Sequence, residues 1–249
     1  SQLDYIVAED SPLIQLPPPK IGEVQRRIGE NIASLVKDGD CLQLGIGAIP
    51  DAVLLFLKDK KDLGIHSEMF SDGVVELIEA GVVTNERKQI DKGQCVATFL
   101  MGTDKLYNYV NDNPSVRMMP VNYVNDPRVI CQNDNVVSIN SCVEVDLMGQ
   151  VCSEAIGLKQ ISGVGGQVDF VRGANMSKGG RTIITMPATA AKGTISKIVP
   201  FLAPGAAVTT SRCDVDYVVT EYGIAQLHGH TLKDRAKQLI AIAAPGFRE

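Results

Sequence analysis

The strongest constraint on the fold is a regular alternation of short apolar runs with longer amphipathic runs between residues 21 and 83. Residues 21–36 repeat apolar side chains at three- and four-residue intervals, which predicts a helix with one buried face. Residues 41–46 form a short, wholly apolar or uncharged run, which predicts a buried strand. Residues 47–60 predict a helix with Pro50 in its first turn.

The same alternation continues with a strand predicted at 63–68 and a helix at 71–83, which Ser71 or Asp72 would cap at the start and Gly81 at the end. Residues 88–135 predict a possible small α+β insert. After residue 135 strand-like runs dominate, among them 135–147 with a hairpin partner, 181–187, 193–200, 206–212 and 216–223. A helix follows the glycines at 165–166, and a closing helix follows Thr231. This order predicts an α/β fold with a mixed, mainly parallel sheet.

Composition narrows the class of protein. The chain has 249 residues, 45% of them hydrophobic and 21% charged, with a net charge of −5. This balance gives no general reason to expect nucleic acid or a membrane surface as partner. No run of 18 apolar residues and no signal peptide is evident. The six cysteines lack CxxC spacing and are interpreted as free thiols of a reducing compartment, so we expect a cytoplasmic protein.

A metal site is not expected. The chain has three histidines, and the pair His228 and His230 has no acidic or thiol neighbour to complete a ligand set. Residues 1–20 contain Pro17, Pro18 and Pro19, which stiffen a chain in an extended form. We interpret 1–20 as a linker from a missing N-terminal domain and 21–249 as the catalytic domain; a processed or tagged start is the alternative.

Two strand–glycine–helix junctions are candidate binding sites. The first contains Gly45 and Gly47, and the second contains Gly163, Gly165 and Gly166. Glycine lets the backbone approach a ligand, and the helix that follows directs its free N–H groups to the same place. Neither junction has the three-glycine spacing of a dinucleotide fingerprint. Both are also compatible with two tight turns that have only a structural role.

The charge distribution adds a phosphate hypothesis. No Asp or Glu occurs from Phe170 to Cys213, whereas six basic residues do: Arg172, Lys178, Arg181, Lys192, Lys197 and Arg212. In an acidic chain this local excess favours a phosphorylated ligand near the second glycine loop. A solvated basic face is the alternative.

Glu68 lies where the strand 63–68 ends, which is the edge at which α/β sheets bind ligands. A carboxylate there can act as a base, a metal ligand or a nucleophile. As a nucleophile it needs no partner base, because it is ionised at neutral pH, but it needs an oxyanion hole, which glycine loops can supply. A merely structural carboxylate at the start of the next helix is the other interpretation.

Four stretches resemble the C-terminal half of the acetyl-CoA hydrolase/transferase family, closest to its 4-hydroxybutyrate and butyryl-CoA:acetate CoA-transferase branch. They are LQLGIGAIPDAV (42–53), LGIHSEMFSDGVVELIEAGV (63–82), SGVGGQVDFVRGA (162–174) and AAVTTSRCDVDYVVTEYGIAQL (206–227). The resemblance covers essentially the whole chain. It implies a CoA-transferase (NagB/RpiA-like) fold and an active site shared with an N-terminal half that this chain lacks.

The resemblance also assigns residues. Glu68 would be the nucleophile that forms a glutamyl-CoA thioester. The loop formed by Gly45, Ile46, Gly47, Ala48, Ile49 and Pro50 and the loop from Gly163 through Gly165 and Gly166 to Gln167 would bind CoA and stabilise the oxyanion. Asn125 would lie near the acyl group, with Asn140 as a second candidate, and Lys192 would meet a CoA phosphate. No metal and no permanently bound cofactor are implied, since CoA is a substrate.

The implied reaction moves CoA between a short-chain acyl-CoA, such as 4-hydroxybutyryl- or butyryl-CoA, and a carboxylate such as acetate, in a homodimer or larger assembly. An acyl-CoA hydrolase with the same nucleophile is the close alternative. A non-catalytic domain that senses CoA or a phosphosugar is an alternative of another class. Glu68 separates these classes, because a sensor has no use for a nucleophile at that strand end.

Overall fold

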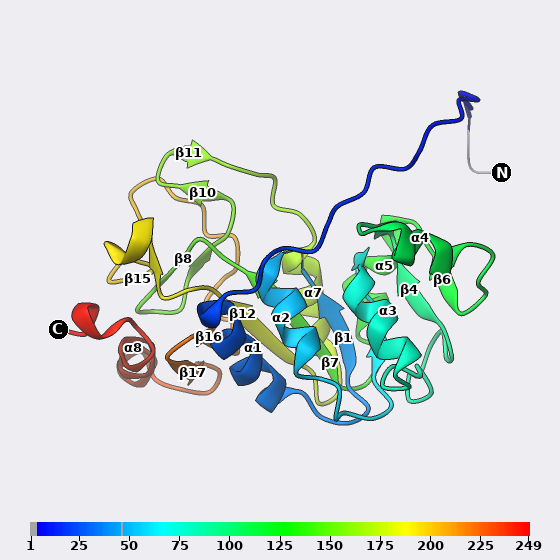
Figure 1. The fold of residues 1–249 in the computed structure, drawn as a ribbon. Helices are drawn as coiled ribbons and strands as arrows, with labels where there is room; N and C mark the ends of the chain where they lie inside the picture. The colour runs from blue at the N-terminus through cyan, green and yellow to red at the C-terminus, as the bar shows by residue number, and fades with distance from the viewer. Residues whose placement is uncertain (1–3, 46) are drawn as a thin grey trace.

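A six-stranded sheet forms the centre of the molecule in a computed structural model that describes residues 4–45 and 47–249 (Figure 1). Its order is β17-β16-β12-β7-β1-β2, and every pair is parallel except β16 with β17. The strands are β1 (Cys41–Leu44), β2 (Gly64–Ile65), β7 (Val136–Ser141), β12 (Arg181–Thr185), β16 (Tyr217–Thr220) and β17 (Gly223–Gln226). The prediction of a mixed, mainly parallel sheet in an α/β fold is confirmed.

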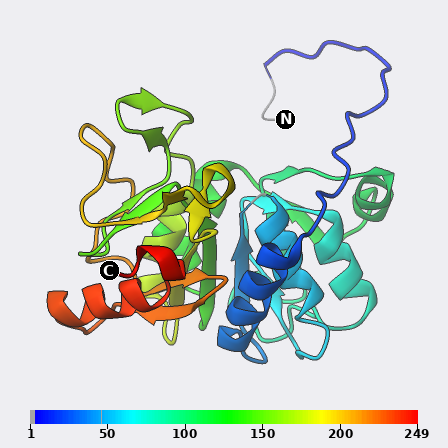
Figure 2. The ribbon, with the colours of Figure 1, turned by 60° about the vertical axis from the view of Figure 1, so that its left-hand side comes forward.

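Helices cover both faces of this sheet, and Figures 1 and 2 show them on its two sides. The helices are α1 (Glu23–Leu35), α2 (Ala48–Leu55), α3 (Asp72–Glu79), α4 (Asp104–Val110), α5 (Val121–Val124), α6 (Pro127–Ile130), α7 (Gln167–Met176) and α8 (Leu232–Ala241), with single 3-10 turns at Ala191–Gly193 and Pro245–Phe247. The predicted helices at 21–36, 47–60, 71–83 and after Thr231 are confirmed within a few residues. The Thr231 hydroxyl accepts the Asp234 N–H, as expected of an N-cap.

Alternation along the central strands divides the core into two sides. Val137 and Ile139 of β7 point to the core that α1, α2 and α3 cover, whereas Val136 points to a second cluster with Phe170 of α7. Val218 of β16 contributes to a third cluster around α8. The parallel strands are therefore buried on both faces, and polar side chains such as Gln43, Ser138 and Asn140 are buried with the apolar ones.

Shorter strand pairs surround the main sheet. They are β3 (Met69–Phe70) with β5 (Phe99–Leu100), β4 (Cys95–Ala97) with β6 (Val116–Met118), β10 (Ala155–Ile156) with β11 (Lys159–Gln160), β13 (Thr189–Ala190) with β14 (Ile195–Ser196), and β8 (Glu144–Asp146) between β9 (Val151–Cys152) and β15 (Ile198–Val199). Residues 88–135 contain both helices and strands, and Cys95, Ala97 and Leu106 belong to the same core cluster as α1 and α2.

One strand of the region 88–135 is short, and the strand predicted at 206–212 was wrong. Residues 116–124 form a strand only to Met118, because Pro120 interrupts the ladder and precedes the short helix α5. Residues 206–212 form no strand: Thr210 makes one isolated bridge to Val151, and Val208 is 48% exposed. Sequence analysis also missed β17, which returns antiparallel from β16 through Gly223 at φ +142°.

The N-terminal segment runs over the surface before α1 begins and extends away from the body of the molecule (Figure 2). The Leu16 N–H donates to the Gly102 carbonyl at 2.8 Å, and the Tyr107 hydroxyl donates to the Ile14 carbonyl, also at 2.8 Å. Its interpretation as an interdomain linker stays a prediction. Within 4–45 and 47–249 no helix is long and apolar enough to cross a membrane.

Candidate active site

Glu68 lies between β2 and β3, at the carboxyl edge of the parallel sheet. Its backbone is held firmly, because its carbonyl accepts the N–H groups of Thr98 at 2.9 Å and Phe99 at 3.0 Å. Its side chain is half-buried and faces the start of α7. The backbone hydrogen bonds thus fix the position of the Glu68 main chain, and its half-buried carboxylate stays accessible to a ligand.

Asn125 meets this carboxylate. It follows α5 directly, is 8% exposed, and donates from Nδ2 to Glu68 Oε2 at 3.0 Å. Its Oδ1 is buried and has no hydrogen-bond partner among the residues that the structure describes. A buried amide with one bond made and one oxygen unpaired is poised to orient a reacting group and is costly to keep for stability alone.

The second glycine loop closes the site from the other side. A Cβ atom added at Gly166 would lie closer to Glu68 Oε2 and Asn125 Nδ2 than any real side chain allows. Gly166 is the N-cap of α7, and its N–H donates to no atom of residues 4–45 and 47–249. Gly165 adopts φ +60°, and Gly163 has open space around it. The helix start therefore presents a free N–H and its positive dipole end beside the carboxylate.

The first glycine loop is arranged differently. The Gly45 N–H is already used, because it donates to the Ile139 carbonyl at 3.1 Å. Gly47 has φ +116° and nothing within 4 Å of an added Cβ, so it faces open space. Ala48, Ile49 and Pro50 form the first turn of α2. Ile46 lies outside the described residues.

Gly47 borders a groove of about 260 Å³ between α2, α3 and the N-terminal segment. Met69 and Leu54 line it, together with the acidic Asp51 and Asp72. Burial raises the pKa of Asp51, and the charges of Asp72 and Glu76 raise it further. This groove is therefore apolar with a negative rim, unlike the surroundings of Gly166.

The two asparagine candidates now separate. Asn140 is 8% exposed, and its amide is fully engaged in a buried network: Gln43 Nε2 donates to its Oδ1 at 3.1 Å, and its Nδ2 donates to Gln43 Oε1 and Ser138 Oγ. Asn125, in contrast, bonds Glu68. The structure thus brings Asn125 to the carboxylate and uses Asn140 to join β1 and β7.

Lys192 lies in another part of the carboxyl edge. It is exposed, adopts φ +56°, and borders a hollow of about 490 Å³ with Gly193, Glu221 and the start of α1. Its neighbour Ala191 is also in the left-handed region, at φ +48°. Two consecutive non-glycine residues in this conformation are strained, which is more common at ligand sites than elsewhere.

Three of the six basic residues between 170 and 213 are held by contacts within the fold, and the phosphate hypothesis for this stretch stays a prediction. Arg181 pairs with the buried Asp40, Arg172 lies 4.0 Å from Asp214, and Lys197 donates to the Cys142 carbonyl at 3.0 Å. Burial lowers the pKa of Lys197. Arg172 and Arg181 thus have acidic partners that lie outside the segment, and Lys197 is bound to a backbone carbonyl.

Sequence analysis missed two groups beside Glu68. Asp169 lies in the first turn of α7; burial raises its pKa, Arg172 opposes this, and the charge of Glu68 adds to it. His66 lies two residues before Glu68 and is fully buried. The period of two along a strand was the available signal for His66, since it places residues 66 and 68 on one side. Residues 4–45 and 47–249 contain no cluster of three or more metal-ligating side chains.

Comparison with known proteins places the chain in a family. Residues 102–249 match the acetyl-CoA hydrolase/transferase C-terminal domain, which is more than half of the chain. The chain belongs to the acetyl-CoA hydrolase/transferase family. All 249 residues align at 68% identity with 4-hydroxybutyrate coenzyme A transferase of Clostridium kluyveri, covering 58% of that protein. Butyryl-CoA:acetate CoA-transferase of Anaerostipes caccae is 42% identical and is covered to 57%.

Solved structures of the family have the same fold. RipA from Yersinia pestis superposes with a TM-score of 0.90 at 50% identity, over 96% of this chain and 54% of that one. A 4-hydroxybutyrate CoA-transferase from Porphyromonas gingivalis gives a TM-score of 0.85, also at 50% identity, over 96% of this chain and 56% of that one. The chain therefore spans little more than half the length of these relatives, and it corresponds to one part of a family member.

Proposed function

We propose that this chain is the nucleophile-bearing part of a CoA-transferase, with Glu68 as the nucleophile. The observation that carries the proposal is the triangle of Glu68, Asn125 and Gly166, in which an amide and a helix N-terminus converge on one carboxylate. The substrates follow from the relatives' names: a short-chain acyl-CoA such as 4-hydroxybutyryl- or butyryl-CoA, and a carboxylate such as acetate. Fold similarity to the α subunit of citrate lyase, with a TM-score of 0.63, favours the NagB/RpiA-like class.

The reaction begins with attack of a Glu68 oxygen on the thioester carbonyl carbon. The C–S bond breaks, CoA leaves as a thiolate, and a mixed anhydride forms on Glu68. The thiolate then attacks the glutamyl carbonyl carbon and releases the first carboxylate, which leaves a glutamyl-CoA thioester. A second carboxylate reverses both steps. Each bond that forms replaces one that breaks, so no oxidant, reductant or net proton is required.

Asn125 and Gly166 have separate tasks in this scheme. The Asn125 amide orients the attacking carboxylate, because its Nδ2–H donates to one of the two carboxylate oxygens. The Gly166 N–H, which has no partner in the described part of the chain, would stabilise negative charge that develops on a carbonyl oxygen. The loop from Gly45 to Pro50 would complete the CoA site, and the exposed Lys192 would meet a CoA phosphate.

A missing N-terminal half of the same protein would close the site from the open side. Both the anhydride and the thioester react with water, so transfer requires that water be excluded. An incompletely closed site would give an acyl-CoA hydrolase instead, with the same nucleophile. We further propose a cytoplasmic homodimer or larger assembly that uses CoA as a substrate and holds no permanent cofactor.

The intact mass of the full-length protein tests the proposal. After incubation with butyryl-CoA, the parent should gain the mass of CoA less one water, because the thioester forms at a side-chain carboxylate. Glu68→Gln should gain nothing and lose at least about 10³-fold of its transfer activity, since a neutral amide is a poor nucleophile. Glu30→Gln makes the same chemical change on the exposed side of α1 and should behave like the parent. A CoA adduct on Glu68→Gln would refute the assignment, and no adduct on either protein would favour a sensor.

A further inference from the structure

His66 occupies a fully buried position behind the nucleophile. It bridges to Val96 at the edge of the sheet and lies between the rings of Tyr123 and Phe170, each 6.4 Å from it between ring centroids. An apolar side chain would suit such surroundings better than an imidazole. The presence of a histidine here therefore requires a reason other than packing.

The hydrogen bonding of His66 supplies that reason. Its Nε2 lies 2.9 Å from the Val124 carbonyl oxygen, which can only accept, so Nε2 carries the proton. No other group of the described chain donates to this carbonyl. The other nitrogen, Nδ1, is buried without a partner among those residues. Burial lowers the pKa of His66 to about 4, so the ring is neutral near pH 7.

Val124 ends α5 and is followed directly by Asn125, the residue that bonds Glu68. A helix of four residues has little stability of its own and depends on tertiary contacts for its position. His66 provides one such contact at the last carbonyl before Asn125. Because His66 and Glu68 are two residues apart in the segment between β2 and β3, this contact ties the asparagine to the segment that carries the nucleophile.

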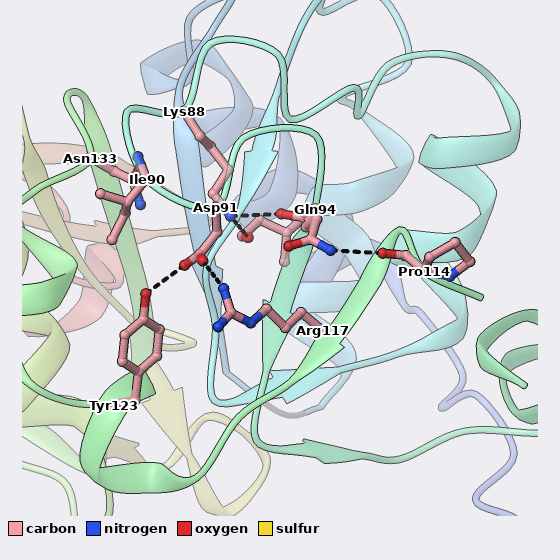
Figure 3. Close-up of polar contacts among 9 residues, drawn as sticks. Lys88, Ile90, Asp91, Gln94, Pro114, Arg117, Tyr123 and Asn133 are labelled. Atoms are coloured by element: carbon pink, nitrogen blue, oxygen red, sulfur yellow. Dashed lines mark hydrogen bonds and ion pairs between the residues drawn. The ribbon is translucent and has the colours of Figure 1, made fainter. Parts of the chain in front are cut away.

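A second anchor holds Tyr123 of α5, and Figure 3 shows its contact with Asp91. The Tyr123 hydroxyl donates to Asp91 Oδ2 at 2.8 Å, and Arg117 donates to Asp91 Oδ1 at 2.5 Å. The Arg117 guanidinium also lies 5.9 Å from the centre of the Tyr123 ring. The Asp91 side chain is 5% exposed, whereas its partner Arg117 stays partly in contact with solvent. The helix α5 is therefore fixed at two consecutive residues, by two independent groups.

We propose that His66 is a positioning residue, which holds the Asn125 amide against the Glu68 carboxylate by fixing the Val124 carbonyl, and that the Asp91–Tyr123 bond is a second, weaker support. The inference rests on the proposed function of Glu68 as nucleophile. His66 itself touches no substrate and transfers no proton. Its effect is on the fraction of molecules in which the amide and the carboxylate are correctly placed.

The first experiment measures kcat and KM of full-length His66→Phe and His66→Gln with butyryl-CoA and acetate. Phenylalanine keeps the ring and removes the donor, so kcat should fall by about 10- to 100-fold, as expected for a small displacement of a catalytic group. KM for the acyl-CoA should change less than about threefold, because binding is not altered. Glutamine can still donate to the Val124 carbonyl and should recover most of kcat.

A double-mutant cycle then tests the route of the effect. In an Asn125→Ala background, His66→Phe should reduce kcat by less than about threefold further, because the group that it positions is already absent. Multiplicative losses would overturn the proposal, as would a kcat equal to that of the parent in His66→Phe alone. Tyr123→Phe, with the same cycle, gives a milder perturbation and decides the question if His66→Phe does not fold.

Ser177→Ala is the matched control for a lost buried hydrogen bond. The Ser177 hydroxyl is buried, donates to the Asn133 carbonyl at 2.6 Å and accepts the Val136 N–H at 3.2 Å, but it is not part of the network around α5. Ser177→Ala should lower the melting temperature without lowering kcat.

The CoA adduct distinguishes the two proposals. Its absence in the parent refutes the function of Glu68, whereas a normal adduct with full kcat in His66→Phe refutes only the role of His66.

Discussion

The two glycine loops look alike in the sequence and differ in the structure. Both follow a strand-like run, and both precede a helix. In the second, Gly166 lies against Glu68 and Asn125, and an added Cβ would collide with both. In the first, the Gly45 N–H is used by the sheet, and Gly47 faces an open groove that Asp51 and Asp72 make acidic.

This difference shows that glycine has two functions here. At Gly166 the lack of a side chain creates the space that the reacting groups occupy. At Gly47 it permits a backbone conformation, φ +116°, that other residues rarely adopt. The number of glycines in a loop does not distinguish these two functions, but substitution of each glycine by alanine does.

Gly166→Ala should have the largest effect. Its Cβ displaces the Glu68 carboxylate or the Asn125 amide, so we expect kcat to fall by about 10³-fold, which combines misplacement of the nucleophile with loss of an oxyanion donor. The φ of Gly166 is −87°, which alanine adopts freely, so the melting temperature should fall only slightly. Steady-state kinetics and thermal melting of the full-length variant check both parts. A kcat within tenfold of the parent would mean that the loop rearranges in the working enzyme.

His66 and Asp51 should have opposite effects on the pH dependence of protein stability. His66, which faces Lys88 and Asp91, has its pKa lowered to about 4 from the usual 6.5, chiefly by burial. The unfolded chain thus binds the proton more readily between these values, and stability falls as the pH drops from 6.5 towards 4, by up to about 1.4 kcal/mol per pH unit. Asp51, which faces Asp72 and Glu76, has a pKa raised above the usual 3.8. The folded chain therefore binds this proton more readily than the unfolded chain, so that a falling pH stabilises the fold at this site until the pH reaches 3.8.

Denaturant unfolding of full-length variants between pH 4.5 and 7.5 separates these contributions. His66→Gln should make the acid-side slope shallower. Asp51→Asn should stabilise the protein at pH 7 and remove the opposing contribution, so that its slope becomes steeper. Parallel slopes for His66→Gln and the parent would show that His66 is already accessible to protons in the folded state.

Lys192→Ala tests where the nucleotide end of CoA binds, relative to both loops. A charge-assisted phosphate contact contributes about 1.5–3 kcal/mol, so KM for acyl-CoA should rise by about tenfold or more. Substrates with pantetheine in place of CoA lack the nucleotide and should be unaffected. Lys178→Ala removes another exposed cation of the same segment and serves as the control. Equal losses with both substrates would exclude a phosphate contact at Lys192.

Much of this arrangement was predictable, because it depends on patterns within short stretches of the sequence. The strand–helix alternation fixes the parallel sheet, and the carboxyl edge of that sheet fixes where Glu68 lies. The family resemblance made Asn125 a candidate near the acyl group, but its hydrogen bond to Glu68 was not predicted, because 57 residues separate the two and no local pattern connects them. The wrong strand at 206–212 and the ion pairs of the basic run have one cause: exposure and ion-pair partners such as Asp40 are set by tertiary contacts that the segments themselves do not encode.

Gly47→Ala should have the smallest effect on catalysis, and it completes the comparison with Gly166→Ala. The added methyl group meets nothing within 4 Å, so kcat should stay within about threefold of the parent, since no catalytic group is displaced. Forcing alanine to φ +116° should instead cost about 1–2 kcal/mol of stability. Gly47→Val fills more of the open space and should raise KM for acyl-CoA if the loop contacts CoA. A large kcat loss in Gly47→Ala would show that both loops touch the reacting groups in the full-length protein.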